Sequence, residues 1–134
     1  MPRNTPLKNS VFRDLDLDLT VHPNSKNLIT LKDDAAVRRA LRNLLLTEHY
    51  DRPFHPEIGS NIRRTLFENF GPQTEITLRN EIRNTIKNFE PRVDVQEIIV
   101  EAIPEENRYS VTLHYYIVND ATIRTAQLFL ERLR

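Results

Sequence analysis

The sequence predicts an α+β fold with an N-terminal extended segment, three helices and a C-terminal antiparallel β-meander. Three observations lead to this prediction. Apolar residues alternate with polar ones near the start of the chain, recur at helical spacing through its middle, and alternate again in its last third. Helices that are separated along the chain from an antiparallel sheet are typical of the α+β class.

The N-terminal region divides into an arm and an extended segment. Residues 1–13 are polar and carry two prolines, so we expect a flexible N-terminal arm without a signal peptide. Residues 14–22 alternate with a period of two, which predicts a half-buried strand that ends at Pro23. Its apolar face would consist of Leu15, Leu17, Leu19 and Val21.

The aspartates of this segment also resemble the start of a calcium-binding loop. Counted from Asp14, however, Leu19 stands where such a loop needs glycine, and Ser25 stands where it needs a bidentate glutamate. The four histidines, His22, His49, His55 and His114, show no helical ligand spacing either. We therefore expect no metal site.

Two helices with a proline-containing loop between them are predicted next. The first spans about residues 34–47, and the second begins at Ser60, which we expect to cap it. Pro53 and Pro56 impose an irregular loop over residues 50–59. The expected core positions of these two helices are Val37, Ala40, Leu41, Leu44, Leu45, Ile62, Leu66, Phe67 and Phe70.

The third helix has a regular apolar stripe. Gly71 and Pro72 end the preceding helix, and Thr74 is the predicted N-cap. Pro91 forces Glu90 out of the helical region, so the helix must stop there. The stripe consists of Leu78, Ile82, Ile86 and Phe89.

Three strands and two turns account for the rest of the chain. Residues 95–103 are rich in β-branched side chains, and residues 109–117 alternate more regularly than any other segment. Turns are predicted at residues 104–107 and 119–120. The last strand, about residues 122–130, carries Ile123, Leu128, Phe129 and Leu130.

The composition excludes several classes of function. Lysine plus arginine and aspartate plus glutamate both number 19, so no general field attracts nucleic acid or an anionic membrane. The chain has no cysteine, which excludes disulfides and thiolate chemistry. With only two glycines, a phosphate-binding glycine-rich loop cannot form, and no cofactor is expected. The length fits a single domain, residues 14–134, after the arm.

The sequence also lacks a recognisable catalytic constellation. Glu57, Glu68 and Glu90 lie beside apolar residues, but their spacing singles out no pair for acid–base hydrolysis. No Gly-x-Ser-x-Gly motif is present to carry a nucleophile. We therefore expect that the protein is not an enzyme.

The segment Glu90-Pro91-Arg92 joins the end of the third helix to the start of the sheet. It places two opposite charges on either side of a rigid residue. Because proline fixes φ, the two side chains would project in set directions and lose little entropy on docking. The alternative is a simple helix stop with an exposed ion pair of little energetic value. The residues alone leave both interpretations open.

Five short motifs, taken in order along residues 12–130, resemble the baseplate wedge or sheath-initiator family. This family occurs in contractile phage tails, R-type tailocins and type VI secretion systems. Ile58 stands where an aromatic residue is common in the family. The motifs are Asp14-Leu15-Asp16-Leu17, Asn43-Leu44-Leu45-Leu46-Thr47, Arg52-Pro53-Phe54-His55-Pro56-Glu57-Ile58-Gly59-Ser60, Leu66-Phe67-Glu68 and Glu90-Pro91-Arg92.

The resemblance implies a structural protein present once per wedge of a sixfold baseplate, with a fold like the strand-exchanging domain of the sheath protein. It implies that the Glu-Pro-Arg segment docks on the helical core bundle of the wedge proteins. Contacts with hub or tube-proximal proteins would also be compatible with it. The expected location is the tail baseplate of a virion, assembled in the host cytoplasm. The residues that we expect to bind partners are Glu90, Pro91, Arg92, Arg52, Pro53, Phe54, Thr122, Arg124, Ala126 and Leu128.

A small β-meander leaves unpaired strand edges, which are templates for added strands. We therefore expect the tail sheath protein to add strands to such an edge, so that the initiator sets the register of the first sheath ring. The last strand and the N-terminal arm are the predicted exchange elements. Two alternatives stay open: a peptidoglycan hydrolase, because the family has been labelled lysozyme-like, and a regulatory module of the anti-adaptor type.

Overall fold

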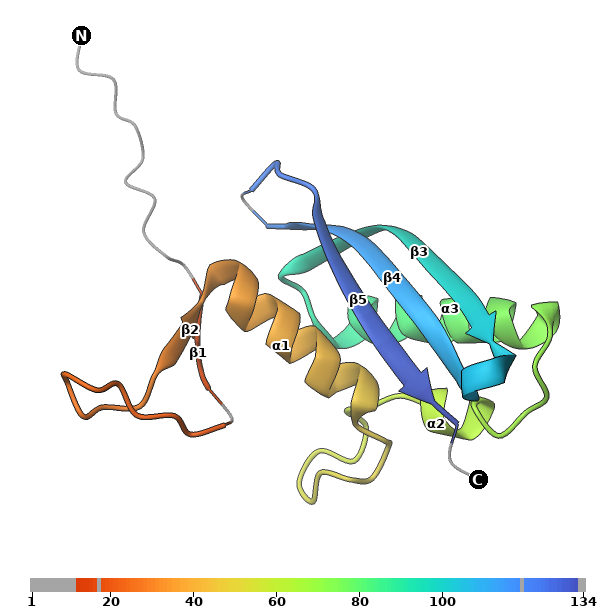
Figure 1. Cartoon of the computed structure of the whole chain (residues 1–134), viewed down its shortest axis with the longest axis horizontal. Helices are drawn as coiled ribbons and strands as arrows, with labels where there is room; N and C mark the ends of the chain where they lie inside the picture. The colour runs from red at the N-terminus through yellow and green to blue at the C-terminus, as the bar shows by residue number, and fades with distance from the viewer. Residues whose placement is uncertain (1–11, 17, 119, 133–134) are drawn as a thin grey trace, which may run out of the picture. The chain divides into compact units, whose positions relative to one another are not determined.

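The structure is a computed structural model that describes residues 12–16, 18–118 and 120–132 (Figure 1). Most of the expected flexible arm, residues 1–13, therefore lies outside the described residues. The chain divides into two compact units, Met1–Arg39 and Ala40–Arg134, and each is described by itself. The expectation of one domain over residues 14–134 stays a prediction.

The first unit contains a small antiparallel hairpin. Strands β1 (Arg13–Leu15) and β2 (Thr30–Lys32) pair, and an isolated bridge joins Val21 to Leu28. The predicted burial of the apolar face is wrong, because Leu15, Leu19 and Val21 are 51%, 63% and 56% exposed. Leu17 lies outside the described residues.

The strand predicted over residues 14–22 does not form, because the segment turns after three paired residues. Leu19 adopts a φ of 53° and its N–H donates to the Asp16 carbonyl at 3.0 Å. The Asp16 carboxylate accepts from Thr20 Oγ1 at 2.7 Å and from Arg39 Nη2 at 2.9 Å. Chiefly the Thr20 hydrogen bond, then the Asp18 N–H and Arg39, hold the pKa of Asp16 below its ordinary value. Asp16 is therefore held by protein donors, and among the described residues no acidic or histidine cluster could hold a metal ion.

Helix α1 (Asp33–Leu46) runs across the boundary between the two units, close to the predicted limits. In the second unit its last turns bury Leu41, Leu44 and Leu45 as predicted. Helix α2 is only four residues long, Ile62–Thr65, and Phe67 beyond it is exposed rather than buried. Asn61, not Ser60, is its N-cap residue.

Helix α3 (Pro72–Phe89) begins two residues before the predicted cap. Gly71 is the N-cap and Pro72 the first helical residue, a position that suits the fixed φ of proline. Thr74 lies within the first turn, and its hydroxyl donates to the Asn69 carbonyl at 2.7 Å. Three of the four residues of the predicted stripe are confirmed, since Leu78, Ile82 and Ile86 are fully buried and α3 packs on β3, whereas Phe89 is only half-buried.

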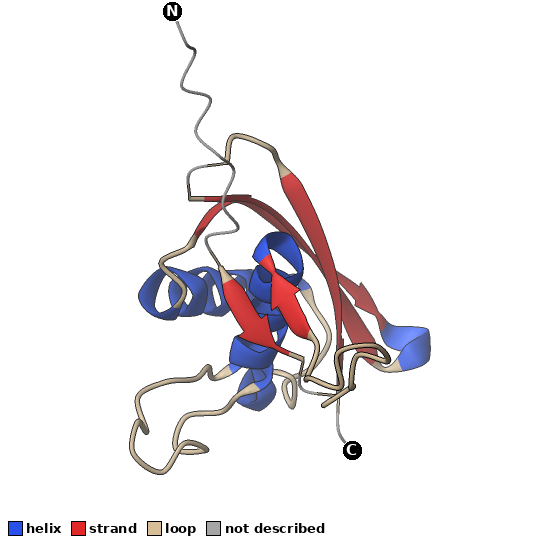
Figure 2. Cartoon of the chain, turned by 90° about the vertical axis from the view of Figure 1, so that its left-hand side faces the viewer, coloured by secondary structure: helices blue, strands red, loops and turns tan. Residues whose placement is uncertain are grey.

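The second unit is built on a three-stranded antiparallel sheet in the order β3-β4-β5 (Figure 2). Strand β3 is Val93–Ile103, β4 is Arg108–Ile117 and β5 is Arg124–Glu131, with a short 3₁₀ helix, η1 (Pro104–Glu106), between β3 and β4. Helix α3 packs on β3 and covers one face (Figure 1). The buried apolar residues of β4 are those that the alternation predicts: Tyr109, Val111, Leu113, Tyr115 and Ile117. Ser110 on the other face is buried as well.

Two details of the sheet differ from the prediction. A β-bulge between Val95 and Glu97 shifts the phase of β3, which places both Val93 and Ile98 in the core. Thr122 lies before β5 rather than in it, and its N–H donates to Asp120 Oδ1 at 3.0 Å. Arg124 Nη2 donates to the same carboxylate at 2.7 Å, and this bond, then Thr122, holds the pKa of Asp120 well below its ordinary value.

Candidate assembly surfaces

The Glu90-Pro91-Arg92 corner contains a two-pronged ion pair. Arg92 Nε donates to Glu90 Oε1 at 2.6 Å, and Arg92 Nη2 donates to Glu90 Oε2 at 2.8 Å. Glu90 is only 6% exposed, so the alternative of an exposed ion pair does not hold for the carboxylate. A buried carboxylate requires such a partner, because an unpaired charge is costly away from water.

Backbone hydrogen bonds fix the same corner. The Glu90 N–H donates to the Ile86 carbonyl at 2.9 Å and caps α3, and the Val118 N–H donates to the Arg92 carbonyl at 2.9 Å. Pro91 between the paired residues is exposed. The corner is therefore rigid, and its exposed tip is the proline ring.

The loop from Thr47 to Ser60 is the second candidate surface. Its irregular course is as predicted, and it contains Arg52, Pro53 and Phe54. The Tyr50 N–H donates to the Pro56 carbonyl at 3.0 Å, and the Ser60 N–H donates to the Thr47 carbonyl at 2.9 Å, which closes the base. Phe54 is 91% and Tyr50 is 83% exposed. An internally bonded loop thus presents two aromatic rings to solvent.

Strand β5 is the third candidate surface, because it forms one edge of the sheet. The Arg132 N–H donates to the Asn107 carbonyl at 3.0 Å, and these residues continue the β4–β5 register. In an antiparallel pair, hydrogen-bonded positions alternate with positions whose backbone groups point away. The backbone groups of Ala126 and Leu128 therefore bond to β4. Those that point to the open edge belong to Thr125, Gln127, Phe129 and Glu131.

The prediction of interface residues in β5 did not take into account which backbone groups point to the open edge. Arg124, Ala126 and Leu128 lie in β5, but Ala126 is buried and Arg124 is held by Asp120. The edge-facing residues alternate with them and carry polar or exposed side chains. The alternation of β5 in the sequence indicates two sets of residues. Which set faces the open edge can be assigned only once the strand that pairs with β5 is known.

The opposite edge, β3, is protected. By the same alternation the backbone groups of Ile98, Val100 and Ala102 point outward. The Ala102 N–H already donates to Glu75 Oε1 from α3 at 3.3 Å. The bulge near Gln96 twists the strand, and bulges are a common device against edge pairing. Among the described residues, no side chain or loop is hydrogen-bonded to the backbone of the four edge positions of β5.

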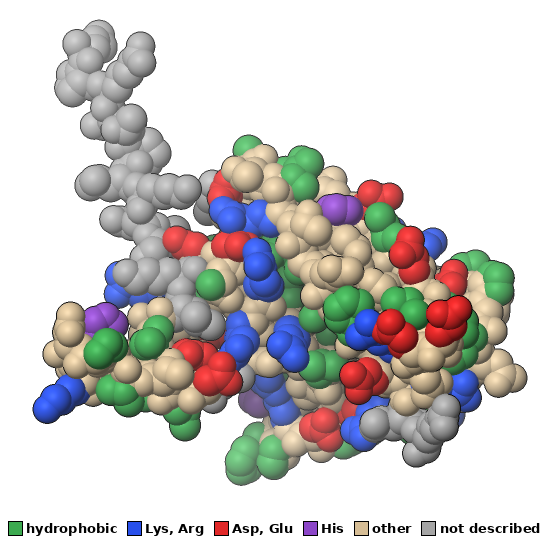
Figure 3. Space-filling model, viewed as in Figure 1, with side chains coloured by type: hydrophobic (Ala, Val, Ile, Leu, Met, Phe, Trp, Pro, Cys, Tyr) green, Lys and Arg blue, Asp and Glu red, His purple; other side chains and the backbone are tan. Residues whose placement is uncertain are grey.

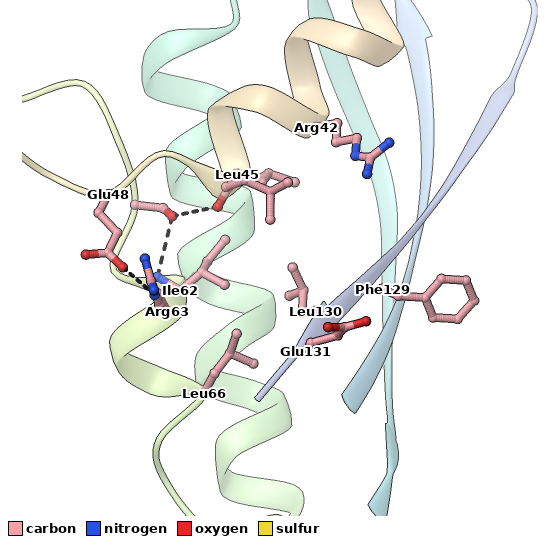
Figure 4. A pocket seen from close by; sticks show the side chains of 11 residues that line it. Arg42, Leu45, Glu48, Ile62, Arg63, Leu66, Phe129, Leu130 and Glu131 are labelled. Carbon is pink, nitrogen blue, oxygen red and sulfur yellow. Dashed lines mark hydrogen bonds and ion pairs between the residues drawn. The ribbon is translucent and has the colours of Figure 1, made fainter. Parts of the chain in front are cut away.

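A pocket of about 380 Å³ lies beside the end of β5. Figure 4 shows that Leu130 points from β5 toward α2, whereas Phe129 points away on the other side of the strand. The residues that line the pocket come from the end of α1, the loop base, α2 and β5: Arg42, Leu45, Leu46, Glu48, Ser60, Ile62, Arg63, Leu66, Phe129, Leu130 and Glu131. The Ser60 hydroxyl donates to the Leu45 carbonyl at 3.0 Å and holds the loop base against α1.

The corner and the pocket lie at opposite ends of the sheet. Val93, next to the corner, pairs with Ile117, and Glu131, in the pocket wall, pairs with Arg108. Arg108 and Ile117 are the two ends of β4. At the usual rise of a strand they are about 30 Å apart. The molecule thus offers two separate surfaces for partners.

None of the three candidate carboxylates has the setting of a hydrolytic acid. Both oxygens of Glu90 bond to Arg92. Glu57 is exposed, and its own backbone N–H, then His55, lowers its pKa, whereas a general acid needs a raised pKa. Glu68 is exposed as well. Charges of both signs are interspersed on the face in Figure 3, which agrees with the balanced composition.

A small α+β unit with one protected and one open sheet edge, and with a rigid corner whose proline is exposed, has features that suit binding to other proteins. The chain belongs to the family described as baseplate wedge protein gp25, whose model matches residues 31–122. It is 29% identical over 103 residues to baseplate wedge protein gp25 of Enterobacteria phage T4, covering 77% of this chain and 76% of that protein.

Three solved structures share the fold. A protein of Geobacter sulfurreducens, named as a proposed tail lysozyme, has a TM-score of 0.68 at 18% identity and covers 73% of this chain and 89% of its own. A chain of the anti-feeding prophage baseplate has a TM-score of 0.63 at 17% identity, covering 92% and 87%. A chain of the postcontracted pyocin R2 baseplate has a TM-score of 0.52 at 17% identity, covering 82% and 96%.

These comparisons support a structural role in a baseplate, since the curated relative and two of the similar structures are baseplate components. Within residues 12–16, 18–118 and 120–132, no helix combines the length and the apolar character needed to cross a membrane.

Proposed function

We propose that this protein is a structural, non-enzymatic component of a contractile-tail baseplate that starts the sheath by accepting a strand on the open edge of β5. The observation that carries the proposal is the asymmetry between the two sheet edges. On β3 the Glu75 carboxylate and the bulge obstruct pairing, whereas on β5 four residues direct backbone groups to an open edge. Such an edge is a template for an extended segment of another chain.

The other two surfaces would attach the protein to the baseplate. The Glu90-Pro91-Arg92 corner would dock on the helical core bundle of the wedge proteins. Phe54 and Tyr50 would fill apolar sites on a neighbouring baseplate protein, because exposed aromatic rings on an ordered loop lose little entropy on docking. The pocket end of β5 lies about 30 Å from the corner, so a strand bound at that end would leave the corner accessible. The site of action would be the virion tail baseplate, after assembly in the host cytoplasm.

Proline at an edge position of β5 tests the sheath role. Thr125→Pro removes an N–H that points away from β4, so it should leave the β4–β5 ladder intact and block a bond to an added strand. In cells that lack the natural gene and express the variant, we expect about tenfold fewer sheathed particles, since one backbone bond is worth about 1 kcal/mol and the proline ring also obstructs pairing. Electron microscopy of purified particles counts the sheathed fraction.

Two variants control this experiment. Thr125→Ala loses the same side-chain hydrogen bond to His114 but keeps the N–H, so its particles should carry normal sheaths. Ala126→Pro removes a ladder N–H and should lower the melting temperature of the isolated protein, which Thr125→Pro should change much less. Normal sheath yield with a correctly folded Thr125→Pro variant would contradict the proposed function.

A further inference from the structure

The pocket beside β5 has one apolar wall and one ionic side. Leu45, Ile62, Leu66 and Leu130 form the apolar wall, and its volume of about 380 Å³ lies in the range of sites that take a whole ligand group. The edge-facing Phe129 and Glu131 belong to the same pocket. A strand that adds to β5 must therefore run past the pocket mouth.

The charged residues of the pocket are not equivalent. Arg63 Nε pairs with Glu48 Oε1 at 3.0 Å, and Glu131 stands directly opposite Arg108 on the face of the sheet that carries Phe129. Arg42 is exposed and, among the described residues, no ion pair is recorded for it. Figure 4 shows its side chain extending from α1 toward the sheet. The guanidinium of Arg108 pairs with Glu106, and Glu131, one residue after the buried Leu130, lies on the other face of β5. Arg42 is thus the positive charge that the inward side chains of an added strand would meet.

The spacing of these groups is about 2 Å shorter than the repeat of a strand, a difference that the long arginine side chain can span. Arg42 and Leu45 are neighbours one turn apart on α1, about 5 Å along the helix. Side chains on one face of a strand recur every second residue, about 7 Å apart. An added strand can therefore place one inward side chain against Leu45 and Leu130 and the next inward side chain near Arg42.

We infer that the groove between β5 and the end of α1 takes an extended segment of the sheath protein that carries an apolar residue and an acidic residue two positions apart. This inference rests on the proposed function. The apolar side chain would fill the pocket, and the carboxylate would pair with Arg42. Backbone bonds to β5 would supply affinity that does not depend on sequence, and the pocket and Arg42 would select the segment and fix its register.

Charge reversal at Arg42 tests the inference. Arg42→Glu places a like charge against the acidic residue, so we expect at least a tenfold loss of sheathed particles with an unchanged melting temperature of the isolated protein. Arg83→Glu is the matched control, because Arg83 is an exposed arginine in the middle of α3 and does not line the pocket. It should leave the sheathed fraction unchanged.

The sheath segment is identified in assembled particles. Leu46, which is exposed in the pocket wall, is replaced by the photoreactive p-benzoylphenylalanine, and mass spectrometry locates the sheath residues that it cross-links. Within that segment we expect the apolar-x-acidic pattern. Replacing its acidic residue with lysine should restore sheaths to the Arg42→Glu variant.

Two results would overturn the inference. One is a normal sheathed fraction for Arg42→Glu together with a reduced sheathed fraction for Thr125→Pro. That result would support strand addition and contradict the role of Arg42. The other is a cross-linked sheath segment without the apolar-x-acidic pattern. A normal sheathed fraction for Thr125→Pro would instead contradict the proposed function itself.

Discussion

Gly59 and Gly71 are the two glycines of the chain, and an added methyl group would meet different surroundings at each. At Gly59, φ is +150° and a Cβ atom would lie 2.6 Å from the Glu48 carbonyl carbon and oxygen. At Gly71 nothing lies within 4 Å of that position. Gly59 therefore allows the loop base to close against the end of α1, whereas Gly71 needs no such close approach.

Gly59→Ala should destabilise the protein by about 2–4 kcal/mol, because both the backbone conformation and the contact with Glu48 are unfavourable for alanine. Gly71→Ala should change the free energy of unfolding by less than about 1 kcal/mol. Chemical denaturation measures both values. Equal effects of the two substitutions would show that the loop base does not depend on the close approach at Gly59.

The Glu90–Arg92 pair contributes to stability as well as to the proposed docking surface. Arg92→Ala leaves a carboxylate that is 6% exposed without its two-pronged partner, so we expect a loss of about 2–4 kcal/mol. Adding Glu90→Gln to Arg92→Ala removes the buried charge and should recover part of that loss.

Arg83→Ala is the control for these variants. Arg83 is an exposed arginine on α3, the helix that Glu90 caps, and its replacement should change the free energy of unfolding by no more than about 0.5 kcal/mol. If Arg92→Ala were as mild as Arg83→Ala, the corner would have no stabilising role. A loss of particle assembly by Arg92→Ala is therefore informative about docking only if the variant is still folded at the assay temperature.

Among the helices and strands, the sequence predicted best those that bury one face in the core, because their apolar residues then recur with a regular period. The α3 stripe, apart from the half-buried Phe89, and the alternation of the apolar residues of β4 are confirmed, because each of these elements buries mainly one face. The α+β class and the order of helices and strands follow from the same two periods. The start of α3 was predicted three residues late, because Gly71 rather than Thr74 is the N-cap and Pro72 occupies the first helical position.

The remaining elements depend on interactions that a period cannot reveal. The leucines of residues 14–22 alternate correctly, yet Leu15 and Leu19 are exposed because the segment turns at Asp16. The bulge near Gln96 changes the phase of β3 without a clear local signal. The candidate site was predicted as far as the Glu90-Pro91-Arg92 corner, the Phe54 loop and the last strand. The residues of β5 that face the open edge could not be predicted, since they depend on which side of β5 pairs with β4.

Across the whole molecule, different surfaces would bind different partners. The corner and the exposed loop would hold the baseplate, and the open edge of β5 would hold the sheath. This division depends on β5 rather than β3 as the accepting edge, which Glu75 and the bulge support. The proposed sheath contact therefore involves the backbone amides of the edge-facing residues of β5.

Residue-resolved hydrogen exchange of those amides, compared between the isolated protein and assembled sheathed particles, tests directly whether a strand adds to β5. In the isolated protein we expect fast exchange at Thr125, Gln127 and Phe129 and slow exchange at Ala126 and Leu128, because only the latter donate to β4. In assembled particles the first three should become protected, while the outward amides of β3 should not change. Unchanged exchange at Thr125, Gln127 and Phe129 in sheathed particles would contradict the account.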